Sequence, residues 1–207
     1  SQDPRDQTHI VLGWLLGPIT DPLATLRARL LSDVLLDNSS SPLRHALETS
    51  ELGAAPSPLC GFDTATREAT FVCGLEGSNP EHAKAVETLI FDVLHQVAAE
   101  GVPQDAVDAA LHQLELSERE ITGDGFPYGL RLLMEALTPA IHGGDPITAL
   151  DGDPLLDQLR AESRATDFIP NLARRLLLEN PHRVRLTMAP DPMLAAKQAA
   201  AERERLA

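Results

Sequence analysis

The sequence is poor in cysteine and in aromatic residues. It has only two cysteines, Cys60 and Cys73, among 207 residues, and aromatics make up 3% of the chain. Two cysteines cannot form the disulfide framework of a small secreted domain. We therefore interpret them as two buried apolar thiols, although a bridge between neighbouring strands is conceivable. The apolar share of 43% is enough for a core, which must be built from Leu, Val, Ile and Ala.

Positive charge is also scarce, because the chain has 17 Lys and Arg residues but 31 Asp and Glu residues, which gives a net charge of −14. Such a balance argues against nucleic acid as a partner and against adhesion to an anionic membrane surface. The sequence has no apolar run of about 20 residues, so no transmembrane helix is predicted. The polar start, residues 1–7, lacks the apolar region of a signal peptide, and we expect it to be a cut inside a longer chain.

Hydrophobic patterning predicts strands and helices in a definite order. A strand apolar on both faces is expected at 9–16, an antiparallel pair at 59–63 and 68–76, and a last strand at 182–189. Helices are expected where an Asp or Asn followed by Pro precedes apolar residues at helical spacing. They are predicted at 23–37, at 42–50, from 80 to 100, from 103 to a break at Gly123 and Gly125, around 130–141, and from 153 and 168 onward.

The predicted order is β-α-β-β-α-β with extra helices before the last strand. It favours an α+β fold of the ferredoxin-like, split β-α-β-β-α-β type, with a mainly antiparallel sheet and helical insertions. We expect one domain over residues 8–190. Residues 191–207 form an Ala-rich tail with Arg and Glu on its polar face.

The sequence contains no complete catalytic or metal-binding motif. A zinc site on a helix needs two histidines on one face with a glutamate, as in HExxH or HxxEH. His112 with Glu115 and His45 with Glu48 each supply only two such residues, and we interpret the first pair as solvated. No GxSxG elbow, CxxC or phosphate loop is present, so we predict no catalytic and no metal-binding residue in this chain.

Tyr128 and Arg131 are the only weak candidates for substrate binding. They lie three residues apart at the start of a predicted helix, so they share a face. Contact with a substrate and ordinary surface pairing both fit this spacing. The basic pair Arg174 and Arg175 is interpreted as a solvated face.

Several ordered blocks resemble the second domain of presequence protease-like enzymes, a branch of the insulinase (pitrilysin) zinc metallopeptidases. The resemblance covers nearly the whole chain, although no single block is diagnostic. The blocks are 19–21, 31–36, 38–47, 61–63, 66–69, 71–77, 128–130, 142–146, 186–188 and 190–191.

The resemblance implies a parent protein of four homologous domains that close around a peptide. The first domain carries HxxEH and the zinc, whereas the second lacks the motif, as does the helix at 23–37 here. The fragment alone is thus expected to have no enzymatic activity and no cofactor, with zinc in the parent's first domain. Its partners would be that upstream zinc-binding domain and the C-terminal half of the same chain, and residues 191–207 would begin an interdomain helical hairpin.

The implied function is to pack on the zinc domain of an endopeptidase that degrades unstructured peptides, and to form part of the chamber wall. One hypothesis is that the acidic charge attracts basic peptides, and the alternative is that it only confers solubility. A free-standing inactive insulinase-like subunit and a hydrolase with an unrecognised site are the competing interpretations. The Ala-, Leu- and Arg-rich composition suggests a bacterial source. We expect a cytoplasmic location, with an exported parent protein as the alternative.

Overall fold

The computed structural model describes residues 6–119 and 127–206 of the chain. The strands are β1 (Thr8–Pro18), β2 (Ala55–Pro56), β3 (Gly61–Asp63), β4 (Glu68–Ser78) and β5 (Arg183–Met188). The helices are α1 (Pro22–Leu36), α2 (Pro42–Glu48), α3 (Ala83–Glu100), α4 (Gln104–Arg119), α5 (Tyr128–Ala140), α6 (Pro146–Leu150), α7 (Asp153–Glu162), α8 (Phe168–Ala173) and α9 (Leu194–Leu206). A 3₁₀ turn (Pro80–His82) precedes α3, and a π-helical segment (Arg174–Leu178) follows α8.

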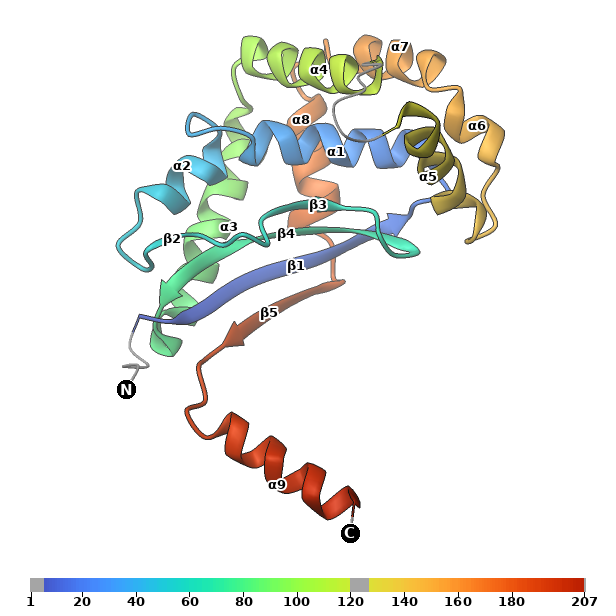
Figure 1. The fold of residues 1–207 in the computed structure, drawn as a ribbon. Coiled ribbons are helices and arrows are strands. Elements are labelled where there is room, and N and C mark those ends of the chain that lie inside the picture. Colours follow the sequence, from blue (N-terminus) through green and yellow to red (C-terminus); the bar gives the residue numbers. More distant parts are fainter. Residues whose placement is uncertain (1–5, 120–126, 207) are drawn as a thin grey trace.

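The strands form one antiparallel sheet with β1 near its middle (Figure 1). The strand order is β2-β4-β1-β5, and β3 also pairs with β4. The order β5-β1-β4-β3 is that of a split β-α-β-β-α-β unit, so the predicted α+β fold class is confirmed. The two-residue strand β2 and the short helix α6 were not predicted. The predicted break at Gly123 and Gly125 lies outside the described residues.

Helix α1 begins where the sequence places its cap. The Asp21 carboxylate accepts a hydrogen bond from the backbone N–H of Ala24 at 2.9 Å, and Pro22 occupies the first turn. A capping carboxylate satisfies an amide that the helix itself leaves unpaired, and proline has no amide to lose there. The start of α1 is therefore encoded locally.

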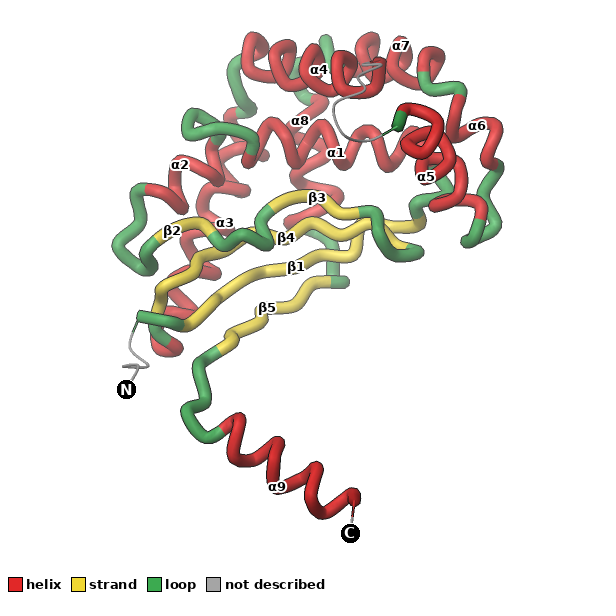
Figure 2. The backbone as a smooth tube through the Cα atoms, viewed as in Figure 1, coloured by secondary structure: helices red, strands yellow, loops and turns green. Residues whose placement is uncertain are grey.

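Helices cover one face of the sheet and form two layers, as the tube in Figure 2 shows. The core lies between the inner face of the sheet and α1, α2, α3 and α8, while α4 and α7 pack outside α1. Its largest buried side chains are mostly leucine and isoleucine, in line with the composition. The core thus has the aliphatic character that the scarcity of aromatic residues requires.

Trp14 joins β1 to the π-helical segment. Its side chain is 1% exposed, and its indole N–H donates to the Leu177 carbonyl at 2.9 Å. Its ring lies 5.8 Å from the ring of Phe71 and 6.3 Å from that of Phe91. The single tryptophan therefore connects segments that are 163 residues apart in the sequence.

Two ion pairs attach α7 to the neighbouring helices. Arg27 on α1 donates to both carboxylate oxygens of Glu162, at 2.7 and 2.5 Å. Arg160 contacts Glu115 on α4 at 2.6 Å. Hydrogen bonding and the attraction of the guanidinium lower the pKa of Glu162, so this carboxylate stays ionised at neutral pH.

Gly74 sits where β1 and β4 approach unusually closely. A Cβ at this position would lie 2.1 Å from the Ile10 carbonyl oxygen and 2.6 Å from Val11 Cα. Gly74 pairs with Val11, and the register of the two strands shifts just beyond the next pair, between Thr8 and Ile10. Only glycine lets the two backbones come this close.

Strand β5 has the reverse of the usual polarity. Arg183 lies 4.9 Å over the ring of Phe91, and Arg185 contacts Glu87 at 2.6 Å, so both arginines point toward α3. Val184, Leu186 and Met188 alternate with them and point to the other face of the sheet. All three are exposed, at 62%, 46% and 39%. No described residue covers this outer apolar row (Val184, Leu186 and Met188).

Helix α9 projects away from the body of the molecule (Figure 1), and its described residues are exposed. The division between a domain at 8–190 and a tail at 191–207 stays a prediction. Among the helices in the described part of the chain, none has the length and apolar character needed to span a membrane.

Candidate functional site

The histidine and glutamate pairs singled out in the sequence do not form metal sites. Glu115 is buried and bound to Arg160, so the prediction that it forms a solvated pair with His112 is wrong. It is wrong because the packing of α7 over α4 places a cation there, which the spacing within α4 could not reveal. Glu48 contacts Arg44 at 2.5 Å rather than His45.

Within residues 6–119 and 127–206, no three His, Cys, Asp or Glu side chains gather as metal ligands would. Helix α1, which the resemblance equates with the zinc helix, contains no histidine. Its acidic residue Asp33 and its C-cap residue Asp37 lack the imidazole partners of an HxxEH site. The residues of α1 therefore do not fit a catalytic zinc.

Tyr128 and Arg131 contact each other. The Arg131 guanidinium lies 5.3 Å from the centre of the Tyr128 ring, and it also donates to the Ser117 carbonyl at 3.1 Å and pairs with Glu135 at 3.4 Å. A cation above an aromatic face is a stabilising contact in itself. The structure thus accounts for the spacing by surface pairing, and a role in substrate binding stays a prediction.

The two cysteines are unpaired thiols. Cys73 is fully buried, and burial raises its pKa well above the usual value for a thiol. Cys60 is half-buried, its sulfur lies 3.3 Å from the Gly74 nitrogen, and burial raises its pKa as well. A thiol whose pKa is raised by burial is a poor nucleophile at neutral pH.

A pocket of about 890 Å³ lies over the face of α1 that points away from the core. Helix α1 lines it along its whole length, because residues three and four apart share one face. The opposite walls come from α5, from the segment around α6 and from β3 with its flanking residues. The α1 residues of the wall are Pro22, Thr25, Leu26, Arg29, Ser32, Asp33 and Leu36, and the C-cap residue Asp37 follows them.

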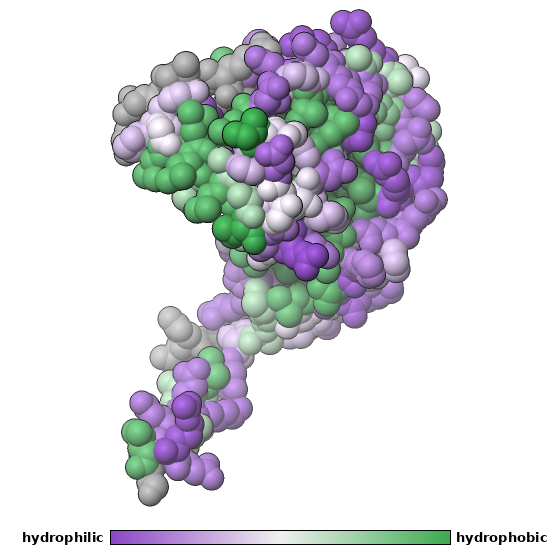
Figure 3. Space-filling view, turned by 90° about the vertical axis from the view of Figure 1, so that its right-hand side faces the viewer, coloured by the Kyte–Doolittle hydropathy of each residue, from purple (hydrophilic) through white to green (hydrophobic). Residues whose placement is uncertain are grey.

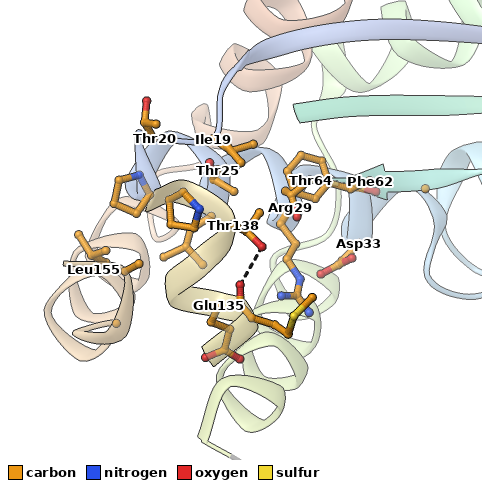
Figure 4. A pocket seen from close by; sticks show the side chains of 18 of the residues that line it. Ile19, Thr20, Thr25, Arg29, Asp33, Phe62, Thr64, Glu135, Thr138 and Leu155 are labelled. Atoms are coloured by element: carbon orange, nitrogen blue, oxygen red, sulfur yellow. Dashed lines mark hydrogen bonds between the residues drawn. The ribbon is translucent and has the colours of Figure 1, made fainter. Parts of the chain in front are cut away.

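Asp33 and Arg29 project from α1 into this pocket, as Figure 4 shows. Burial raises the pKa of Asp33 to about 6, Arg29 opposes that rise, and Asp37 adds to it. Phe62 from β3 forms an apolar wall near Asp33, and Glu135 of α5 also lines the pocket but points away from Asp33. A carboxylate in such a place is poorly solvated, and a bound cation would stabilise its charge.

The pocket was not predicted from the sequence. Its lining residues span positions 19 to 155, so no local motif contains them. The only local signal is an acidic residue, Asp33, in the apolar run Leu30–Leu36. The described walls combine apolar side chains with a few polar and charged groups, as is typical of binding pockets.

Two solved structures of similar fold are described as inactive peptidase domains. An inactive peptidase domain from Bordetella parapertussis superimposes with a TM-score of 0.65 at 16% identity, over 89% of this chain and 91% of that one. The peptidase M16 inactive domain from Pseudomonas fluorescens gives a TM-score of 0.57 at 17% identity, over 90% of this chain and 42% of that one. At these identities the likeness establishes the fold alone.

Sequence similarity assigns the chain to a family, which the likeness of fold alone does not. The chain belongs to the peptidase M16 inactive domain family, whose model matches residues 1–114. It is 31% identical over 207 residues to the mitochondrial presequence protease of Xenopus tropicalis, and 33% identical over 205 residues to presequence protease 1, chloroplastic/mitochondrial, of Arabidopsis thaliana. The resemblance noted in the sequence is thereby confirmed.

The chain spans only a fifth of these relatives. The matches cover 100% and 97% of this chain but 20% and 19% of the Xenopus and Arabidopsis proteins. The relatives named here are eukaryotic, whereas the two solved domains come from bacteria. A bacterial source and a cytoplasmic location stay predictions.

Proposed function

We propose that this chain is a noncatalytic domain of a presequence protease-like zinc metalloendopeptidase that degrades unstructured peptides. In this proposal the domain packs on the zinc domain and forms part of the wall of the peptide chamber. The zinc and its HxxEH motif belong to the upstream domain. Support comes from the family match, from the one-fifth coverage of presequence proteases, and from an α1 helix without zinc ligands.

The observation that carries the docking part of the proposal is the outer apolar row of β5. A strand normally turns its apolar residues toward its own core, and here it turns Arg183 and Arg185 inward. Exposed apolar residues that gather on one face mark interaction surfaces. The outer apolar row continues onto Leu15 of β1, which is also exposed. A second domain laid on this face would bury these side chains.

The first experiment tests for catalysis in the isolated chain. Purified residues 1–207 are analysed for bound zinc and assayed with unstructured peptides. We expect neither zinc at stoichiometric level nor peptide cleavage, because α1 provides no ligands. Cleavage that persists in the purified chain and is lost with a chelator would overturn the proposal.

The second experiment tests docking. The longer natural protein is expressed as two pieces, this chain and the segment preceding it, and their association is measured by sedimentation. Leu186→Glu is expected to weaken association by roughly tenfold or more, because it places a charge in an apolar contact. Leu116→Glu on α4 is the control, since this leucine is equally exposed on the helical side. Equal association of both variants would contradict docking through β5.

A further inference from the structure

Strand β5 lies at an open edge of the sheet. It is the last strand in the order, it pairs with β1 on one side, and no described strand pairs with its other side (Figures 1 and 2). All six of its residues are exposed. An unpaired strand edge is a template for pairing with another strand, and proteins usually cover or blunt such edges. The outer side of β5 is therefore open to an additional strand.

Alternate backbone groups of β5 point toward this open edge. The backbone N–H of Leu15 donates to the His182 carbonyl at 3.0 Å, and this pair continues the register in which β1 meets β5. Hydrogen-bonded and non-hydrogen-bonded pairs alternate along two antiparallel strands. The residues of the outer apolar row therefore direct their backbone groups to β1, whereas Arg185 and Thr187 direct theirs outward. An added strand would find two N–H donors and two carbonyl acceptors there.

The side chains of β5 predict the pattern of such a strand. Arg183 and Arg185 lie on the inner face of the sheet, and the outer apolar row lies on the other face. Residues directly opposite each other on neighbouring strands share a face and interact. An added strand would thus bring alternate side chains next to two arginines and the remaining ones next to an apolar row. The complementary pattern is an alternation of acidic and apolar residues.

The inner side of this edge has an excess of positive charge. Arg185 and Lys84 share one carboxylate, that of Glu87, at 2.6 and 3.0 Å. Arg183 donates to the Leu178 carbonyl at 3.1 Å, which carries no net charge. These four charged side chains together are positive, although the chain as a whole has a net charge of −14. Acidic side chains on a partner strand would be complementary to them.

A second copy of this chain does not suit the same edge. Pairing two β5 strands would gather the arginines of both copies, Arg183 and Arg185, on one pair of strands. Like charges on neighbouring strands are destabilising, and charged residues that point inward on an edge strand protect it against self-association. The net charge of −14 on each copy opposes association further. The edge thus selects an acidic partner.

Helix α5 carries another group of exposed apolar residues, which includes Leu133, Met134 and Leu137. Figure 3 looks onto this end of the molecule and shows apolar surface gathered there. Backbone groups within a helix bond to one another, so α5 presents side chains alone. β5 instead combines an apolar row, free backbone groups and positive charge, and these three features together specify a partner.

We propose that the edge of β5 accepts an extended segment in which acidic and apolar residues alternate, as an additional antiparallel strand. Its backbone bonds to Arg185 and Thr187, its acidic side chains lie beside the two arginines, and its apolar side chains extend the outer apolar row. We assign this strand to the preceding segment of the longer protein, because the proposed docking places that segment against the adjoining outer face. The source of the strand rests on the proposed function, whereas strand binding can be measured on this chain alone.

The first test titrates residues 1–207 into a fluorescent eight-residue peptide of alternating glutamate and valine, and follows anisotropy at physiological ionic strength. A second peptide has lysine in place of glutamate. Two more peptides carry N-methyl groups on every glutamate or on every valine. The glutamate N–H groups would face β5, because residues opposite Arg185 and Thr187 form hydrogen-bonded pairs.

We expect binding of the glutamate peptide and of the peptide methylated on valine, and no binding of the other two. The lysine peptide lacks the acidic groups, and methylation of the glutamates removes the donors that face β5. Equal binding of the two methylated peptides, equal binding of the lysine peptide, or no binding of the glutamate peptide would overturn the proposal.

Paired variants locate the binding on β5. Thr187→Pro removes an outward N–H that the sheet does not use, and it should weaken binding of the glutamate peptide by roughly tenfold or more. Thr187→Val keeps this N–H and should change binding by less than about twofold. Arg185→Gln should weaken binding by about threefold to fivefold, and Arg164→Gln, at an exposed arginine after α7, by less than about twofold. Thermal melts verify that each variant is folded, and equal effects within both pairs would place the peptide elsewhere.

Amide exchange in the two-piece association experiment tests the source of the strand. The amides of Arg185 and Thr187 should exchange rapidly in the isolated chain and become protected when the preceding segment binds. Association without this protection would show docking through the outer face alone and would overturn the assignment of the strand to that segment. A lack of association would contradict the proposed docking, while the peptide titration still decides whether the edge accepts a strand.

Discussion

The two faces of helix α1 have different tasks, although they alternate along the same fifteen residues. On one face Leu30 and Leu35 are fully buried against the sheet and the neighbouring helices. On the other face Arg29 and Asp33 line a pocket. The first face holds the domain together, and the second keeps a partly buried charge that weakens it. The comparison teaches that a helix without zinc ligands can still carry a binding surface.

The largest expected effect is on the core face. Leu35→Ala should lower the free energy of unfolding by about 3 kcal/mol, because a fully buried leucine is replaced by a cavity. Urea denaturation measures this loss. Leu26→Ala, on the half-buried pocket face, should cost clearly less, and equal costs would show that the two faces do not differ in packing.

The next largest effect is an increase in the free energy of unfolding, and it comes from a substitution on the pocket face of α1. The pKa of Asp33 is about 6 when folded, above its ordinary value of 3.8, so ionisation opposes folding. This penalty is absent below about pH 4, grows as the pH rises through 6, and is then constant. Asp33→Asn should therefore stabilise the domain by about 1 kcal/mol at neutral pH, after allowance for solvent screening, and by little at pH 4.

Melting temperatures of both proteins across this pH range provide the measurement. The charged groups that act on Asp33 are Arg29 on α1, which lowers its pKa, and Asp37 at the C-cap of α1, which raises it. Glu135, Asp145 and the Cys60 thiol also line the pocket. Asp92→Asn, which removes an exposed carboxylate from α3, is the matched control for the loss of one negative charge. A stabilisation equal at both pH values would mean that Asp33 is not held in a poorly solvated site.

The smallest effect lies at the border between the two faces, where Arg27 joins α1 to α7. A double-mutant cycle of Arg27→Met and Glu162→Gln should give a coupling of about 0.5–1 kcal/mol, because the pair is bidentate yet partly solvated. Chemical denaturation of the four proteins measures it. A coupling near zero would mean that packing alone holds α7 in place.

Much of the fold could be predicted because its signals are local. β1, α1, α3 and β4 were placed by capping residues, proline positions and apolar periodicity, which act over a few residues. β2 was missed because two residues have no period, and only their pairing with β4 makes them a strand. The spacing of the apolar residues in α5 predicted an apolar stripe on this helix. It could not show whether another part of this chain covers that stripe.

The candidate site was harder to predict, since its walls meet only in three dimensions. α1, β3 and α5 are separated by long stretches of chain, and the sequence held no pattern linking Asp33 to Phe62 or Met134. The burial of Glu115 had the same cause, because its partner Arg160 lies on α7. The absence of a zinc motif, by contrast, could be read from the sequence, because such a motif is confined to one helix.

The position of Trp14 also has a practical consequence. It is the only tryptophan in the chain, so intrinsic indole emission arises from one point, at the junction of β1 with the segment before β5. Solvent reaching this ring would shift the emission to longer wavelength as soon as β1 separates from Leu177. Fluorescence thus offers a built-in probe of whether the two ends of the domain remain joined when a partner docks on the sheet.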